Sequence, residues 1–190
     1  MSGKPLYSVQ RWLMLSETET VEVPDGHFER CRWLTEQAKK HGDRILDVGC
    51  CDGFMFRDLD LDVVEADLMH AFPPQYRHKI KFVRADAHHL PFKDGAFKCT
   101  VLGDMLEHVN DPVQVLKEVS RVSKCAYISV PNEWEWDETK RPFQHSQHLR
   151  FYTIHTLIAD IEKGLDTSRS IKIHKARGGG WSFFCVEYEK

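Results

Sequence analysis

Carboxylates and glycines gather at the ends of short apolar runs in this sequence. They are Asp47, Gly49 and Gly53 at the first run, Asp67 at the second, Asp86 at the third, and Gly103 with Asp104 at the fourth. Glycine lets a backbone approach a ligand closely because it carries no Cβ. Acidic side chains suit a ligand with hydroxyl groups and a positive charge. The pattern therefore favours a small cationic ligand over a nucleotide phosphate.

Histidines that could act as bases lie in two later segments. His108 follows Glu107 in GDMLEHV, and His145 and His148 lie in RPFQHSQHLRFYT. Histidine is the usual base where an oxygen nucleophile must lose its proton. Each has a plainer alternative, since His108 could only pack over a bound ligand and His148 could only order its loop. His108 and His148 are our candidate catalytic residues.

The apolar runs predict strands, and helical spacing predicts the segments between them. The expected strands are 44–49, 62–67, 80–86, 97–104, 125–132, 170–176 and 181–189, and the expected helices are 27–42, 113–123, 153–164 and a short one from Phe54. Five strand–helix alternations are typical of a parallel sheet. We expect a three-layer, Rossmann-like α/β sandwich, with a mostly parallel seven-stranded sheet and a C-terminal antiparallel hairpin. Ligands of such sheets bind beyond the carboxyl ends of the strands.

Length and composition set the remaining bounds. The 190 residues carry a net charge of −3, and we expect one domain, 1–190, with 1–26 as an arm or lid. No apolar stretch resembles a membrane helix or a secretory signal, so we expect a cytoplasmic protein without a membrane partner. Its six cysteines should stay reduced there, and none forms C-x-x-C. Cys99, Cys125 and Cys185 are expected to be small core residues.

Four segments resemble the class I S-adenosylmethionine-dependent methyltransferases. RILDVGCCDGFMFRDL resembles their first motif and VVEADL their second, while AYISVPN is similar to their fifth strand. KFVRADAHHLPFKDGAFKCTVLGDMLEHVNDPVQVLKEVSRV resembles the adenine-binding and post-fourth-strand segments. The resemblance runs from about residue 28 to 165. It implies S-adenosyl-L-methionine as cofactor and methyl transfer to an oxygen or nitrogen of a small-molecule acceptor.

The resemblance also implies where the cofactor binds. Its methionine portion would lie at the first turn, its ribose at the acid after the second strand, its adenine after the third, and its sulfonium near the fourth. The corresponding residues are Asp47, Gly49, Cys50 and Gly53, then Asp67 and Leu68, then Asp86 and Ala87, then Gly103 and Asp104. One position departs from the family pattern, because Cys51 stands where a second glycine is usual.

Two alternatives remain open on these residues. Asp104, Glu107, His108 and His148 are also similar to the ligand set of metal-dependent RNA 3′-terminal 2′-O-methyltransferases. The charge of −3 and the absence of additional RNA-binding domains argue against a nucleic-acid partner, and we assign no metal ligand. The other alternative is a non-catalytic cofactor-binding or scaffold domain, because Cys51 replaces the usual glycine.

Aromatic side chains in the segment 133–152 are candidates for the wall of an acceptor pocket. They are Trp134, Trp136, Phe143, Phe151 and Tyr152. The identity of the acceptor and the oligomeric state are not encoded in any pattern that we find in the sequence.

Overall fold

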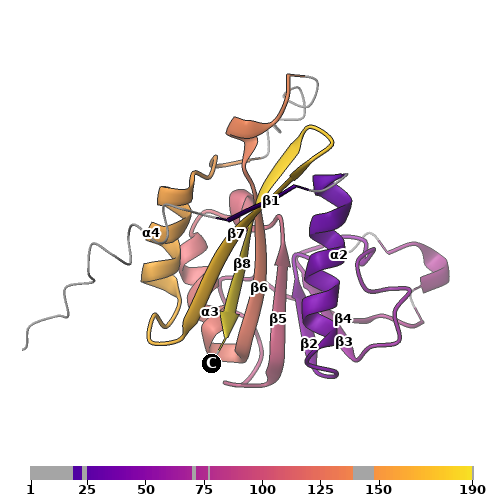
Figure 1. Cartoon of the computed structure of the whole chain (residues 1–190). Coiled ribbons are helices and arrows are strands. Elements are labelled where there is room, and N and C mark those ends of the chain that lie inside the picture. Colours follow the sequence, from indigo (N-terminus) through magenta and orange to yellow (C-terminus); the bar gives the residue numbers. More distant parts are fainter. Residues whose placement is uncertain (1–18, 23–24, 70–71, 77, 139–147, 190) are drawn as a thin grey trace, which may run out of the picture.

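The structure is a computed structural model that describes residues 19–22, 25–69, 72–76, 78–138 and 148–189. Within these ranges the strands form a single sheet (Figure 1). They are β1 (Glu19–Glu22), β2 (Ile45–Val48), β3 (Val63–Asp67), β4 (Lys81–Arg84), β5 (Phe97–Gly103), β6 (Ser123–Pro131), β7 (Ser170–Gly178) and β8 (Trp181–Glu189). The α-helices are α2 (Gly26–Lys39), α3 (Pro112–Val122) and α4 (Ile154–Gly164).

The sheet order is β1-β7-β8-β6-β5-β2-β3-β4. Every neighbouring pair is parallel except the two that involve β8, which runs against both β6 and β7. The seven expected strands and the C-terminal hairpin are therefore confirmed. The sheet has an eighth strand that we did not expect, because β1 is only four residues long and too short to give a readable pattern.

The chain reverses direction across the sheet between β2 and β5. From β2 it builds outward through β3 to β4 at one edge, and it then crosses back to β5 on the other side of β2. Loops that leave the carboxyl ends of β2 and β5 consequently diverge. Such a switch point is where open parallel sheets bind their ligands.

Helices cover both faces of the sheet, as Figure 1 shows for α2 on one side and α3 with α4 on the other. Leu34 and Ala38 of α2 pack into a core cluster with Ile45 and Tyr127. The larger cluster on the opposite face takes its helical side chains from α3 and α4. The three-layer sandwich is thus confirmed. None of the helices among the described residues is long and apolar enough to cross a bilayer.

Local sequence explains where each helix begins. The Asp25 carboxylate caps α2 by accepting from the His27 and Phe28 amides, and Asp111 caps α3 through the Gln114 amide, just before Pro112. Thr153 and Thr156 cap α4 reciprocally. These caps fix the directions in which the loops at the carboxyl edge enter their helices.

One helix prediction and the count of strand–helix alternations were wrong. The segment from Phe54 forms hydrogen-bonded turns, and its Arg57 amide makes one helical bond, 3.0 Å to the Gly53 carbonyl. Aspartates at every second position from 58 to 62 are poor helix formers, which explains the early end. The described residues between β3 and β5 also contain no α-helix, only the 3-10 turn Pro74–Tyr76, so the five alternations are not all present. Consecutive prolines at 73 and 74 disfavour a helix there.

Candidate active site

The turn after β2, residues 49–53, is held open by glycines and is called the glycine turn below. Gly49 and Gly53 have φ of +80° and +69°, and a Cβ on Gly49 would lie 2.6 Å from Met105 Cγ. A Cβ on Gly53 would lie 2.8 Å from Phe72 Cε1. Both positions therefore require glycine for their conformation and for the packing of neighbouring loops. We had predicted close approach to a ligand; the contacts shown are with the chain itself.

Cys51 occupies the same turn with the same unusual backbone. Its φ is +51°, in the left-handed region that a side chain rarely adopts. The thiol is exposed, whereas that of the neighbouring Cys50 is buried, and burial raises the pKa of Cys50. The departure from the family pattern is thus accommodated by a strained residue whose side chain faces solvent.

Asp67 ends β3 directly beside the glycine turn. Its Oδ2 accepts the Cys51 amide at 3.0 Å, and its Oδ1 accepts the Met69 amide at 3.1 Å. Each carboxylate oxygen has two lone pairs, so both can accept a further hydrogen bond. Leu68, the next residue, is 57% exposed. The structure therefore places Asp67 where a ligand on the turn would meet it.

Two carboxyl groups are buried beneath the turn. Asp47 of β2 and Glu65 of β3 are register partners, and both side chains are almost fully buried. Burial raises the pKa of Asp47 well above its usual range, and the neighbouring Glu65 adds to this. Burial also raises the pKa of Glu65 to about 7. Neither oxygen of Asp47 accepts a hydrogen bond from the described residues.

Asp86 and Ala87 follow β4, one strand further along the same edge. The Asp86 carboxylate is exposed and accepts from the His88 amide at 2.9 Å and from His88 Nδ1 at 2.7 Å. Those hydrogen bonds lower the pKa of Asp86. Ala87 is buried. Asp86 thus lies at the predicted edge, and its carboxylate is already oriented by His88.

Asp104 follows β5, but its carboxylate is held by a partner that sequence reasoning missed. Arg30 Nη1 lies 2.8 Å from Asp104 Oδ2, and the Ser129 hydroxyl donates to Oδ1 at 2.9 Å. Arg30 is 4% exposed, on the buried face of α2. The sequence spacing could have predicted this position, because Arg30 precedes Leu34 by one helical turn and therefore lies on the same buried face of the helix.

A cavity of about 220 Å³ opens beside Asp104 at this edge, and we call it the two-histidine cavity. Its lining residues come from α2, the loops after β5 and β6, and β8: His27, Asp104, Glu107, His108, Pro131, Trp136, His148, Trp181 and Phe183. Met105, whose side chain packs on Gly49, lies in the chain between Asp104 and Glu107, which line this cavity. Two predicted regions, the cofactor turn and the histidines, are therefore neighbours in space.

Both candidate catalytic histidines line this cavity. The rings of His108 and His148 meet edge to face, with centroids 4.6 Å apart. His148 Nδ1–H donates to the carboxylate of Glu133, a buried residue that sequence reasoning also missed. His108 is exposed at the mouth. His145 lies outside the described residues.

Glu107 completes a possible ligand group with these histidines. Ligand atoms of Glu107, His108 and His148 all lie within 4.8 Å of one another. Glu107 is 1% exposed, neither of its carboxylate oxygens accepts a hydrogen bond from the described residues, and burial raises its pKa. Three members of the four-residue metal alternative are thus brought together, while Asp104 is bound to Arg30 instead.

The predicted aromatic wall is only partly correct. Trp136 lines the cavity, but Trp134 and Phe151 are exposed, Tyr152 is buried in the main core, and Phe143 lies outside the described residues. Trp134 and Phe151 instead contact each other.

The aromatic residues that do line the cavity with Trp136 come from a distant strand. Trp181 and Phe183 stand on β8, and the Trp181 ring centroid lies 4.8 Å from that of Trp136. Sequence reasoning missed both because their strand returns to the cleft only through the final hairpin.

Known proteins resemble this chain in sequence and in fold. The family model described as a methyltransferase domain matches residues 46–125. A demethylmenaquinone methyltransferase of Renibacterium salmoninarum is 36% identical over 89 residues, which are 44% of this chain and 38% of that protein. A malonyl-[acyl-carrier protein] O-methyltransferase of Legionella pneumophila is 30% identical over 112 residues, 53% and 38% of the two chains.

A solved S-adenosylmethionine-dependent methyltransferase of Archaeoglobus fulgidus has the same fold, with a TM-score of 0.66 at 14% identity over 87% of this chain and 95% of that one. The chain spans 37 to 44% of the length of the curated relatives it matches. The matched segment holds the glycine turn, Asp67, Asp86 and both ends of β5. In this segment the chain resembles methyltransferase domains, and its fold is that of solved S-adenosylmethionine-dependent methyltransferases.

Proposed function

We propose that this protein binds S-adenosyl-L-methionine at the carboxyl ends of β2, β3, β4 and β5 and methylates a small-molecule acceptor in the two-histidine cavity. The observation that carries the proposal is the glycine turn at the switch point of the sheet, with the Asp67 carboxylate hydrogen-bonded to its Cys51 amide. The cavity with two candidate bases lies next to that turn across the Met105 segment.

The residues at the edge fit such a cofactor. Asp67 retains lone pairs for two vicinal hydroxyls, and charge-assisted hydrogen bonds of this kind are each worth about 1.5–3 kcal/mol. Asp47 is a buried carboxyl without a hydrogen-bond partner among the described residues, which suits an ammonium group. When bound, the cofactor supplies an electrophilic methyl group on a sulfonium. Asp86, Ala87 and Gly103 would border the rest of the molecule.

His148 is the residue we propose as general base. Its Nδ1 hydrogen is bound by Glu133, so Nε2 carries the lone pair that can take a proton from an acceptor. The Glu133 carboxylate also stabilises the imidazolium that results. The His148 side chain is only 5% exposed, which limits competition from bulk water. His108, at the mouth, would orient the acceptor or pass the proton to solvent.

The acceptor class follows from the cavity and from the relatives. A volume of about 220 Å³ with three aromatic side chains admits a compact organic group rather than a folded polymer. Two relatives, a demethylmenaquinone methyltransferase and a malonyl-[acyl-carrier protein] O-methyltransferase, also point to small organic groups. We propose transfer to an oxygen or nitrogen, because His148 offers a base for either.

A second candidate function is metal-assisted methylation of an RNA 3′-terminal 2′-hydroxyl. The observation that favours it is the grouping of Glu107, His108 and His148, with the Glu107 carboxylate buried and without a hydrogen bond from the described residues. It ranks second because Asp104, the fourth ligand of the sequence pattern, is bound to Arg30. The net charge of −3 also disfavours a phosphate backbone.

One labelling experiment distinguishes these functions. The reduced protein is incubated with methyl-labelled S-adenosyl-L-methionine and either a small-metabolite extract or short RNA, with and without EDTA. Label in the small-molecule fraction that persists with EDTA supports the first proposal. If RNA becomes labelled and EDTA abolishes that labelling, the second function, metal-assisted RNA methylation, replaces the first. Measurable cofactor binding without transfer to any acceptor would favour a non-catalytic cofactor-binding domain.

A further inference from the structure

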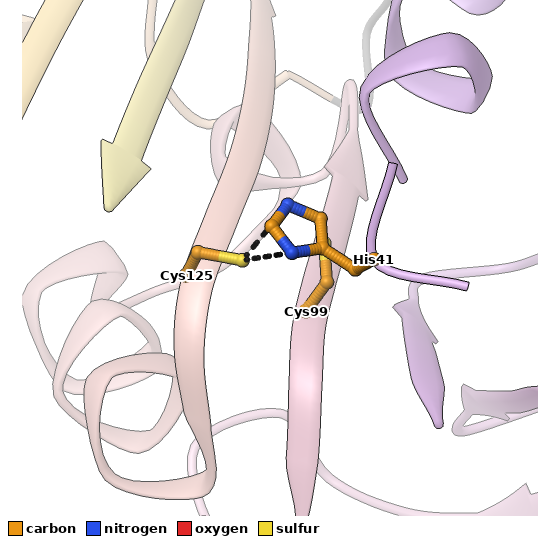
Figure 2. A group of neighbouring side chains, drawn as sticks. All are labelled: His41, Cys99 and Cys125. Carbon is orange, nitrogen blue, oxygen red and sulfur yellow. Dashed lines mark hydrogen bonds between the residues drawn. The ribbon is translucent and has the colours of Figure 1, made fainter. Parts of the chain in front are cut away.

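A second cluster of metal-ligating side chains lies at the opposite end of the sheet. Cys99 and Cys125 occupy equivalent positions near the amino ends of β5 and β6 and are register partners. His41 reaches them from the turn that follows α2, as Figure 2 shows. Ligand atoms of the three residues all lie within 4.8 Å of one another. We call these residues the thiol cluster.

The hydrogen bonds around His41 fix which ring nitrogen carries the lone pair. The Tyr127 hydroxyl donates to Glu189 Oε1 at 2.5 Å, so its oxygen must act as acceptor toward His41 Nε2, 2.9 Å away. Nε2 therefore bears the hydrogen, and Nδ1 bears the lone pair. Nδ1 lies 3.7 Å from Cys125 Sγ. Metal-binding histidines commonly have their second nitrogen bound in this way, in a chain that ends on a carboxylate.

The His41–Cys125 spacing is that expected for two ligands of a tetrahedral thiolate site, and all three ligand atoms lie within 4.8 Å of one another. Bond lengths of about 2.3 Å to sulfur and about 2.0–2.1 Å to nitrogen place such ligands about 3.5 Å apart. Cys125 Sγ lies 3.7 Å from His41 Nδ1 and 3.4 Å from His41 Nε2, and both separations are close to that value. An ordinary S–H···N contact would have a similar length, so the experiment below has to separate the two.

Charge and burial also suit a divalent cation that prefers sulfur. Two thiolates carry a charge of −2, which balances a dication. Because the imidazole is neutral, the bound site would have no net charge among the buried strands. Cys99 and Cys125 are 0% and 4% exposed, while His41 is half-buried and gives solvent access. We propose that His41 Nδ1, Cys99 and Cys125 form a site for Zn²⁺ or a similar thiophilic cation, with a solvent molecule in the fourth position.

Protonation determines when this site would bind. Burial lowers the pKa of His41, which keeps the imidazole in its neutral, ligating form. The Cys125 thiol and burial together raise the pKa of Cys99, so this thiol stays protonated until a cation displaces the proton. Affinity for the cation should therefore rise with pH. The site would tie the end of α2 to β5 and β6, far from the glycine turn along the strands.

Cobalt titration of the reduced, metal-free protein tests the proposal. Co²⁺ bound to thiolates gives an intense thiolate-to-metal absorption, which Co²⁺ at Glu107, His108 and His148 cannot give because that group has no sulfur. We expect this absorption at one equivalent, its displacement by Zn²⁺, and a higher melting temperature of the zinc-loaded protein.

Variants complete the test. His41→Gln and Cys125→Ser should each abolish the absorption, and Tyr127→Phe should weaken binding about tenfold by removing the partner of Nε2. Cys185→Ala is the matched control, since Cys185 is a buried thiol on β8 outside the cluster. His41 is half-buried in a turn, so His41→Gln decides the matter if Cys125→Ser does not fold. No thiolate absorption, or absorption retained in His41→Gln, overturns the proposal.

Discussion

The two ends of the same central strands carry opposite kinds of chemistry. At the carboxyl ends, β2, β3 and β5 lead into a glycine turn, acidic side chains and a cavity with two histidines. At the amino ends of β5 and β6, the two thiols of the thiol cluster are buried and His41 is half-buried, and none of the three forms a salt bridge among the described residues.

This difference follows from the topology of a parallel sheet. Loops at the carboxyl ends diverge at the switch point and leave room for a ligand, whereas the amino ends are closed by tight connections. The carboxyl end therefore holds groups that need a ligand or water to be stable, such as Asp47 and Glu107. The amino end holds the thiol cluster, whose hydrogen-bond chain leads from His41 through Tyr127 to Glu189. We infer that binding and transfer belong to the first end and that the second serves stability.

The largest expected effect concerns the proposed base at the carboxyl end. His148→Gln should lower kcat by about 10²–10⁴-fold and leave the cofactor Kd nearly unchanged, because a general base contributes to the transfer step. Single-turnover kinetics beside a binding titration measures both. His155→Gln, an exposed histidine on α4, is the control. Equal losses of kcat and affinity would instead make His148 a loop-ordering residue.

The next effect concerns the cofactor itself. Asp67→Ala should weaken S-adenosyl-L-methionine binding by about 150-fold, which corresponds to the loss of two charge-assisted hydrogen bonds at the lower value of about 1.5 kcal/mol each. Asp60→Ala, an exposed carboxylate in the loop before β3, should bind normally. An unchanged Kd in Asp67→Ala would show that the ribose does not bind at Asp67. Cobalt binding at the thiol cluster should be equal in both variants.

A smaller effect concerns the buried carboxyls under the glycine turn. The pKa of Glu65 is raised from its ordinary 4.5 to about 7, so the folded protein binds more protons than the unfolded chain between these values. Unfolding free energy should therefore fall as pH rises from 4.5 to 7, by about 3 kcal/mol at about 1.4 kcal/mol per pKa unit.

Urea unfolding of Glu65→Gln across this pH range measures the effect. The variant should lose the share of Glu65, about 3 kcal/mol, while Asp47 and Glu107, whose pKa values burial also raises, keep theirs. Glu162→Gln, exposed on α4, should retain the whole decline. A decline of the same size in Glu65→Gln would assign the titration to another group.

The smallest effect concerns the residue that departs from the family pattern. Cys51→Gly removes a side chain from a left-handed backbone position and should raise the unfolding free energy by about 0.5–1 kcal/mol. Cofactor affinity should be unchanged or higher, because the Cys51 amide that Asp67 accepts is a backbone group. Thermal unfolding and calorimetry measure the two quantities. Weaker binding in Cys51→Gly would show that the thiol itself contacts the ligand.

The sequence predicts most of the fold because it depends on local patterns. Buried strands read as continuous apolar runs, and acids that end those runs had to meet at one edge, as Asp67 and Asp86 do. β1 was missed because four residues are too few for a periodic signal. The predicted helix from Phe54 was wrong because the aspartates at 58, 60 and 62 are poor helix formers.

The contacts that orient the candidate site are less predictable because they join distant segments. Arg30 meets Asp104 across 74 positions, and Glu133 meets His148 across 15 positions. The thiol cluster had a weak signal, since Cys99 and Cys125 are both the third residue of neighbouring strands. The two cysteines can be recognised as neighbours only when the strand order is known, and the structure provides that order.

The central claim is that cofactor binding belongs to the carboxyl end alone. Calorimetric titration of S-adenosyl-L-methionine into the reduced protein, with and without EDTA, tests it most directly. We predict one site with a micromolar Kd that EDTA does not change, and the same Kd in His41→Gln. No binding in either condition, or binding that His41→Gln abolishes, would contradict the account.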